Sequence, residues 1–135
     1  MDIRTFPYAL KIATVEDSPI VADRLQQMFS DLNCLDFVGN ADCLEDALRL
    51  INEQRPAVVI LDIHLKANAP HYSGIDLLAG LRTTYPQMVI IMLTNLASTQ
   101  YRNRCMALGA NYFFDKSNEF EKLPETLNML INPKN

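Results

Sequence analysis

The segment AVVILDIHL, from Ala57 to Leu65, is apolar at both odd and even positions. A strand with one solvated face would alternate apolar with polar side chains, so this pattern is typical of a central strand that helices cover on both faces. Asp62 interrupts the apolar run near its end. The segment therefore predicts a parallel sheet between two helical layers, with an ionisable group close to the end of its central strand.

Four further apolar runs lie on either side of this segment and alternate with stretches that have the spacing of amphipathic helices. They are Lys11 to Val15, the weaker run Asp36 to Ala41, Met88 to Leu93, and Tyr112 to Phe114. Strands that alternate with helices are typical of an α/β protein. We therefore expect a (βα)5 doubly wound parallel sheet with the flavodoxin-like strand order 2-1-3-4-5.

Helix boundaries are indicated by capping residues, prolines and glycines. The third helix is expected at Ile75 to Thr84. The candidate N-caps are Ser18, followed by Pro19, for the first helix, Asp42 for the second, and Ser98 or Thr99 for the fourth. The second helix is closed by Pro56 and the fourth ends at Gly109, whereas Pro124 breaks or begins the last helix. The expected buried faces are Ile20, Val21, Leu25, Met28, Phe29 and Leu32 in the first helix, Leu44, Ala47, Leu48 and Ile51 in the second, Tyr101, Cys105 and Leu108 in the fourth, and Leu123, Leu127, Leu130 and Ile131 in the last.

Length and composition limit the classes of protein to consider. The chain has 135 residues, of which 49% are hydrophobic, so we expect one domain over residues 1–135 with a core at about 10–131. Sixteen acidic and twelve basic residues give a net charge of -4, and the basic residues are scattered, so direct nucleic-acid binding is not expected. The chain shows neither a signal peptide nor an apolar run long enough to span a bilayer, which predicts a cytoplasmic protein without membrane contact.

Cysteine and histidine do not indicate a metal or disulfide site. The three cysteines form no CxxC motif and lie far apart in sequence, so reduced thiols are expected. His64 and His71 have no third nitrogen or sulfur ligand nearby in sequence, so exposed loop histidines are the simpler interpretation.

Polar side chains follow four of the five expected strands. Glu16 and Asp17 end the first strand, and Asp62, Thr94 and Lys116 follow the third, fourth and fifth. The carboxyl ends of parallel strands meet at one edge of the sheet, so the three carboxylates are expected to share one pocket. Their repulsion is usually relieved by a raised pKa or by a bound hard cation, and oxygen ligands favour Mg2+ as that cation. Such a pocket is suited to phosphoryl transfer onto a carboxylate.

The same ordered set of residues, Glu16-Asp17, LDIHL around Asp62, Thr94 and GANYFFDKS around Lys116, resembles the receiver domains of bacterial two-component response regulators, the CheY-like domains. The resemblance covers nearly the whole chain. It implies that Asp62 is the phospho-acceptor. It also implies a Mg2+ site of Asp17, Asp62, the backbone carbonyl of His64 and Glu16, the last chiefly through water. In this resemblance Lys116 pairs with the carboxylate or phosphate, Thr94 supplies the switch hydroxyl, and Phe113 is the switch aromatic.

The resemblance also implies partners. A histidine kinase or phosphotransfer protein would donate the phosphoryl group, and the fourth helix, fifth strand and fifth helix would form a surface for an unknown output protein. A monomer or weak homodimer is expected. The chain is then either a stand-alone receiver or a piece of a larger protein, and its sequence identifies neither the cognate kinase nor the output pathway.

Four positions depart from the pattern of that family. Lys66 stands where a proline is usual, and the twelve residues from Asp62 to Gly74 exceed the common spacing. Ala67 to Ser73 is therefore expected to form an enlarged loop beside the site. Ser117 stands where a proline often follows the lysine, and Phe113 lacks the hydroxyl of the commoner tyrosine.

Other interpretations fit parts of the pattern. A phosphatase or hydrolase with an aspartyl nucleophile would need a cap, for which only the Ala67 to Ser73 loop is available. A flavodoxin-like cofactor carrier would need a phosphate-cradling loop where this chain has EDSP. A degenerate receiver that only docks partners is disfavoured because all five matched positions are present. Taken alone, Glu16-Asp17 would complement a helix dipole and Lys116 would be a solvated loop lysine.

Overall fold

The computed structural model describes residues 9–65 and 73–133, and they form one five-stranded parallel sheet in the order β2-β1-β3-β4-β5. The predicted flavodoxin-like order is therefore confirmed. The strands are β1 (Leu10–Val15), β2 (Leu35–Ala41), β3 (Val58–Leu61), β4 (Val89–Thr94) and β5 (Tyr112–Asp115). All four neighbouring pairs are parallel.

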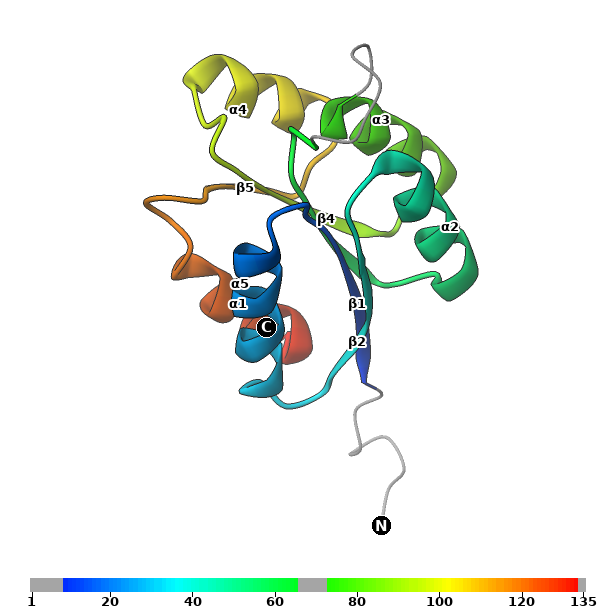
Figure 1. Cartoon of the computed structure of the whole chain (residues 1–135), viewed down its shortest axis with the longest axis vertical. Coiled ribbons are helices and arrows are strands. Elements are labelled where there is room, and N and C mark those ends of the chain that lie inside the picture. The colour runs from blue at the N-terminus through cyan, green and yellow to red at the C-terminus, as the bar shows by residue number, and fades with distance from the viewer. Residues whose placement is uncertain (1–8, 66–72, 134–135) are drawn as a thin grey trace.

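Five helices cover the two faces of this sheet (Figure 1). They are α1 (Pro19–Ser30), α2 (Leu44–Gln54), α3 (Gly74–Thr84), α4 (Thr99–Ala107) and α5 (Lys122–Ile131). The buried hydrophobic side chains of α1 and α5 belong to one core cluster, and those of α2, α3 and α4 belong to the other. The sheet is thus enclosed on both sides, as the apolar central segment predicts.

Strand β3 divides its side chains between the two cores. All four of its residues are buried. Val58 and Ile60 pack in the α1 and α5 cluster, whereas Val59 and Leu61 pack in the α2 to α4 cluster. This alternation explains why the segment has no polar position until the strand has ended, and Asp62 is the first residue after it.

The predicted caps are confirmed for α1 and α4 and wrong for α2. Ser18 accepts a hydrogen bond from the amide of Val21, and Ser98 accepts one from the amide of Tyr101. The N-cap of α2 is Cys43 rather than Asp42, and its side chain makes no cap hydrogen bond. Two acidic residues in the first turn of α2 complement the helix dipole instead.

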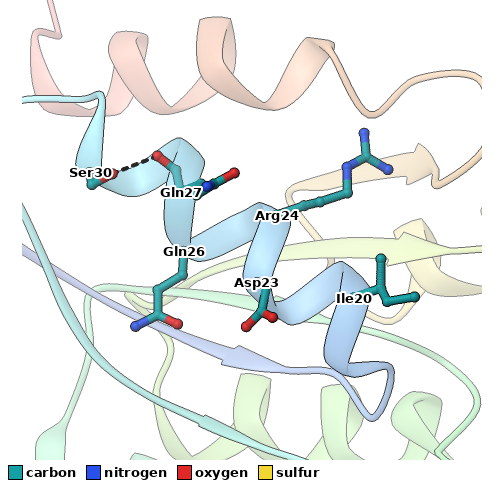
Figure 2. A pocket seen from close by; sticks show the side chains of 6 residues that line it. All are labelled: Ile20, Asp23, Arg24, Gln26, Gln27 and Ser30. Atoms are coloured by element: carbon teal, nitrogen blue, oxygen red, sulfur yellow. Dashed lines mark hydrogen bonds between the residues drawn. The ribbon is translucent and has the colours of Figure 1, made fainter.

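Three residues assigned to buried helix faces are exposed. Ile20 is 74% exposed, Leu48 is 46% exposed and Tyr101 is 36% exposed. At 3.6 residues per turn, Ile20 lies roughly 140° around the axis from Leu25, so it points away from the sheet. It lines a shallow hollow on the outer surface of α1, together with Asp23, Arg24, Gln26, Gln27 and Ser30 (Figure 2).

Part of the chain beside the sheet edge is not described by the structure. Lys66 and His71, and all of the expected enlarged loop from Ala67 to Ser73 except Ser73 itself, lie outside the described residues. Ser73 is the N-cap of α3 and forms a capping box with Asp76. Among the described residues, no helix is long and apolar enough to cross a membrane, and the three cysteines are free thiols.

Candidate functional site

The register of β1 and β3 places two acidic residues at the same level of the sheet edge. Val15 and Leu61, the last residues of these strands, are paired. Glu16 and Asp62 follow them directly, and the amide of Asp62 donates to the carbonyl oxygen of Val15 at 3.1 Å. Residues more than forty positions apart in sequence are therefore held side by side by one ladder of hydrogen bonds.

Three carboxylates converge at this edge, as the sequence predicts. One oxygen from each of Glu16, Asp17 and Asp62 can be chosen so that all three lie within 4.8 Å of one another. Glu16 is only 3% exposed and Asp62 only 6% exposed, whereas Asp17 is half-buried. These side chains line a cavity of about 280 Å³, together with Ser18, His64, Thr94, Asn95, Leu96 and Lys116. The cavity thus contains residues that follow four different strands.

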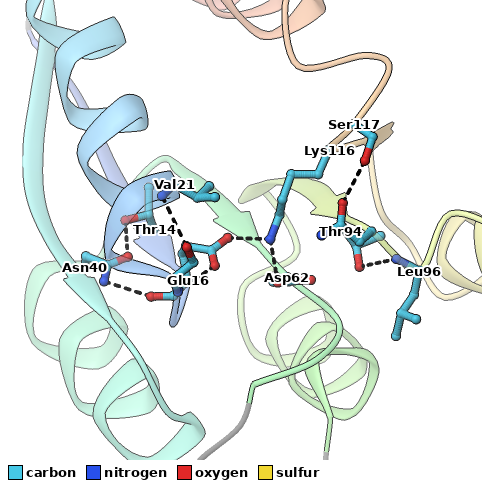
Figure 3. A network of polar contacts seen from close by, with 11 residues as sticks. Thr14, Glu16, Val21, Asn40, Asp62, Thr94, Leu96, Lys116 and Ser117 are labelled. Atoms are coloured by element: carbon cyan, nitrogen blue, oxygen red, sulfur yellow. Dashed lines mark hydrogen bonds and ion pairs between the residues drawn. The ribbon is translucent and has the colours of Figure 1, made fainter.

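The ammonium group of Lys116 lies between two of these carboxylates. Its Nζ is 2.8 Å from Oε1 of Glu16 and 2.8 Å from Oδ2 of Asp62 (Figure 3). The backbone also positions it, because the amide of Lys116 donates to the carbonyl oxygen of Thr94 at 2.9 Å. With its side chain only 9% exposed, Lys116 is the local counter-charge of the pocket and not a solvated loop lysine.

Burial perturbs the ionisation of this pocket. Desolvation raises the pKa of Glu16 above its ordinary value, although hydrogen bonds from Lys116 and from the amide of Ser18 oppose the shift. Burial lowers the pKa of Lys116, but hydrogen bonds to Asp62 and Glu16 outweigh burial, so this pKa lies above its ordinary value. The positive charge of Lys116 is therefore retained, while a negative charge on Glu16 is costly to bury.

Glu16 also has the structural role that its sequence context suggests. Its Oε2 accepts from the amide of Ser18 at 2.9 Å, immediately before α1. The two interpretations of the Glu16-Asp17 pair are therefore compatible, because one oxygen of Glu16 faces the helix start and the other faces Lys116.

Of the remaining residues singled out in the sequence, two line the cavity and one lies in the hydrophobic core. Thr94 is fully buried, and its hydroxyl oxygen accepts from the amide of Leu96 at 3.1 Å. His64 lines the cavity and is exposed. Phe113 is not part of the cavity lining. It packs in the α2 to α4 core, with the guanidinium carbon of Arg102 4.8 Å from the centre of its ring.

Two residues that the sequence argument did not single out as site residues also shape the site. Gly74 lies against the Asp62 loop, and a β-carbon at Gly74 would be 1.9 Å from the carbonyl oxygen of Asp62. Asn40 donates from Nδ2 to the carbonyl oxygen of Glu16 at 3.0 Å. Gly74 lies too far from Asp62 in sequence for its contact with Asp62 to be predicted, and no sequence motif marks Asn40.

The donor set of this pocket fits a hard divalent cation. Its three converging ligands are all carboxylate oxygens, which Mg2+ prefers. Among the described residues that line the cavity, Lys116 is the one with a cationic side chain, and it pairs with Glu16 and Asp62. Fold and pocket together define the class of protein as a doubly wound α/β domain with an acidic site for a divalent cation at its strand ends.

Comparison with known proteins identifies the family within this class. The family model described as response regulator receiver domain matches residues 12–128. The chain belongs to this family. Its fold, strand order and role in two-component signalling are those of a receiver domain.

The relatives include response regulators and sensory transduction proteins. The chain is 26% identical over 122 residues to response regulator GacA of Pseudomonas aeruginosa, covering 90% of this chain and 55% of that protein. It is 28% identical over 118 residues to the sensory transduction protein LytT of Bacillus cereus, covering 87% and 46%. The chain thus spans about half the length of these relatives. The crystal structure of the BeF3-activated N-terminal receiver domain of Klebsiella pneumoniae RstA superposes with a TM-score of 0.77 at 27% identity, covering 90% of this chain and 98% of that one.

Proposed function

We propose that Asp62 accepts a phosphoryl group in a Mg2+-dependent reaction and that the resulting acyl phosphate switches a protein-interaction surface. The observation that carries this proposal is the arrangement of Asp62 at the sheet edge. Its carboxylate lies within 4.8 Å of two other acidic side chains and 2.8 Å from the ammonium of Lys116. Carboxylates and a lysine so placed match the requirements of phosphoryl transfer, which needs positioning and charge neutralisation more than covalent assistance.

The transfer step uses groups that the pocket provides. An oxygen of Asp62 attacks the phosphorus atom, the bond between phosphorus and the donor's imidazole nitrogen breaks, and the electron pair and a proton stay with the donor imidazole. Lys116 and the Thr94 hydroxyl would meet the phosphoryl oxygens. Mg2+ would be held directly by Asp17, Asp62 and the backbone carbonyl of His64. Glu16 would hold the ion through a water molecule. The ion, when bound, neutralises charge on the transferred group.

The partners follow from this chemistry and from the family. A histidine kinase or a phosphotransfer protein supplies the phosphoryl group in the cytoplasm, and the chain works as one receiver unit over residues 1–135, with its core at about 10–131. The RstA receiver domain is BeF3-activated, which supports a switch of this kind here. Output passes through Thr94 and Phe113 to the surface of α4, β5 and α5, where an output protein binds. The chain itself is a monomer or weak homodimer.

A phosphatase that acts on diffusible substrates is the competing function. It would use the same aspartyl nucleophile but would release product repeatedly. The charged residues that line the described cavity would hold a cation and a phosphoryl group, and Leu96 is the one apolar residue in this described lining that could contact the rest of a diffusible substrate. We therefore favour a phospho-acceptor whose only substrate is its own acyl phosphate, which it hydrolyses slowly.

Intact mass spectrometry after incubation with acetyl phosphate and Mg2+ tests the proposal. We expect one phosphoryl group per wild-type chain and none on Asp62→Asn. Steady release of many equivalents of phosphate would support the phosphatase instead. An unmodified wild type, or an Asp62→Asn variant that is still modified, would contradict the assignment of Asp62.

A further inference from the structure

Asn40 connects strand β2 to the backbone of the two acidic residues that follow β1. Its amide nitrogen donates to the carbonyl oxygen of Glu16 at 3.0 Å. Its amide oxygen accepts from the hydroxyl of Thr14 at 2.6 Å (Figure 3). Thr14 is only 1% exposed, so Asn40 satisfies a buried hydroxyl and anchors the end of β1 with one side chain.

A local irregularity in β2 makes this contact geometrically feasible. The pairing of β1 with β2 shifts between Ile12 and Ala13, so that Thr14 pairs with Asn40. Gly39, the residue before Asn40, has a φ of +146°, a conformation that side-chain-bearing residues rarely adopt. A bulge of one residue turns the following side chains to the opposite face. The bulge therefore places Asn40 on the side of the sheet where Thr14 lies.

The contact fixes the peptide group that joins Glu16 to Asp17. The amide of Glu16 already donates to the carbonyl oxygen of Ala41 at 2.9 Å. Because Asn40 donates to the Glu16 carbonyl, both the amide and the carbonyl of Glu16 are hydrogen-bonded to residues of β2. The plane of this peptide sets the direction in which the backbone of Asp17 continues, so Asn40 constrains the position of the Asp17 carboxylate through the backbone.

We infer that Asn40 is a positioning residue for the cation site, and this inference rests on the proposed function. By holding the Glu16 carbonyl, it keeps Glu16 and Asp17 oriented toward Asp62 before any cation binds. Partners that orient metal ligands typically contribute ten- to a hundredfold in metal affinity. Because Asn40 acts through the backbone of the ligands, the lower end of that range, about tenfold, is expected here.

The test measures Mg2+ affinity by titration calorimetry on the full chain, with Mg2+ alone as the probe. Asn40→Ala removes both hydrogen bonds. Thr14→Val removes the hydroxyl that orients the Asn40 amide and keeps the shape of the side chain. Asn33→Ala is the matched control, because Asn33 is an exposed asparagine before the opposite end of β2. Urea unfolding of each variant separates loss of stability from loss of affinity.

The expected result is an approximately tenfold weaker Mg2+ affinity in Asn40→Ala, a smaller loss in Thr14→Val and no change in Asn33→Ala. The amide resonances of Asp17 and Ser18 in the metal-free protein should also shift in Asn40→Ala, and saturating Mg2+ should restore its rate of acetyl phosphate labelling. An Asn40→Ala variant that is less stable but binds Mg2+ as well as the wild type would refute the inference alone. If Asn40→Ala does not fold, an unchanged affinity in Thr14→Val refutes it. A wild type that takes up neither Mg2+ nor phosphoryl would instead refute the proposed function.

Discussion

Replacing Gly74 by alanine should displace the loop that carries Asp62. We expect a larger effect on this loop than from alanine at any other described glycine. A β-carbon at this position would lie 1.9 Å from the carbonyl oxygen of Asp62 and 2.9 Å from the α-carbon of Ile63. Both contacts are with backbone atoms, which cannot rotate away. The amide of Gly74 also donates to the carbonyl oxygen of Ile63 at 2.7 Å, so the helix start and the loop are tied together.

The loss in stability and in labelling rate depends on how far the new β-carbon and the carbonyl oxygen of Asp62 must move apart. A carbon and a carbonyl oxygen approach to about 3.3 Å at closest in ordinary contacts, so the Asp62 loop or the start of α3 must move by about 1.4 Å. Overpacking of this kind costs about 3 kcal/mol or somewhat more in unfolding free energy. A displacement of about 1 Å at a reacting group can cost about a hundredfold in rate.

The assay compares Gly74→Ala with Gly80→Ala, which lies in the same helix. A β-carbon at Gly80 meets no atom within 4 Å, so this control should gain about 0.5 to 1 kcal/mol from helix propensity. Urea unfolding measures stability, and intact mass after short exposure to acetyl phosphate measures the rate of modification. A Gly74→Ala variant as stable and as rapidly modified as Gly80→Ala would refute the steric argument.

Three further predictions concern charged groups. Lys116→Met leaves Glu16 and Asp62 without their shared counter-charge, so urea unfolding at pH 8 with EDTA should show a loss of about 3 kcal/mol in the free energy of unfolding. Mg2+ or a lower pH should restore this stability, and a variant as stable as the wild type with EDTA would argue against a buried bridge. Arg82 donates to the carbonyl oxygens of Gly109 and Met88 and to Asn111, so Arg82→Met should cost about 3 kcal/mol, and a loss below about 1 kcal/mol would contradict this role. Backbone and side-chain hydrogen bonds lower the pKa of Glu119 to about 2, so the stability that its ionised carboxylate contributes is complete above its ordinary pKa and disappears as pH falls toward 2. The difference in unfolding free energy between the wild type and Glu119→Gln should therefore shrink as the pH is lowered. A difference that stays constant with pH would exclude the ionised carboxylate as its source.

The order of elements could be predicted from the sequence because buried parallel strands need continuous apolar runs. The run around Ile60 and the caps at Ser18 and Ser98 each depend on neighbouring residues alone, and all three are confirmed. The meeting of Glu16 with Asp62 also followed, because the end of every parallel strand lies at the same edge. Local patterns therefore suffice where topology fixes the geometry.

The differences arise where a position depends on the exact direction of a side chain or on a distant partner. Spacings of three and four residues predict that Ile20 and Leu48 lie on the buried faces of their helices. Both side chains lie to one side of the buried stripe instead and are exposed. The role of Arg82 depends on carbonyl groups of two other loops. Asn40 depends on a bulge in β2 that no sequence motif marks.

The most direct measurement of the central claim is a calorimetric titration of the wild-type chain with Mg2+, repeated on Asp17→Asn. If the acidic side chains that follow β1 and β3 form one cation site, the wild type will bind one equivalent of Mg2+, and Asp17→Asn will bind it far more weakly while remaining folded. Absence of Mg2+ uptake by the wild type, or the same affinity in Asp17→Asn, would contradict the account.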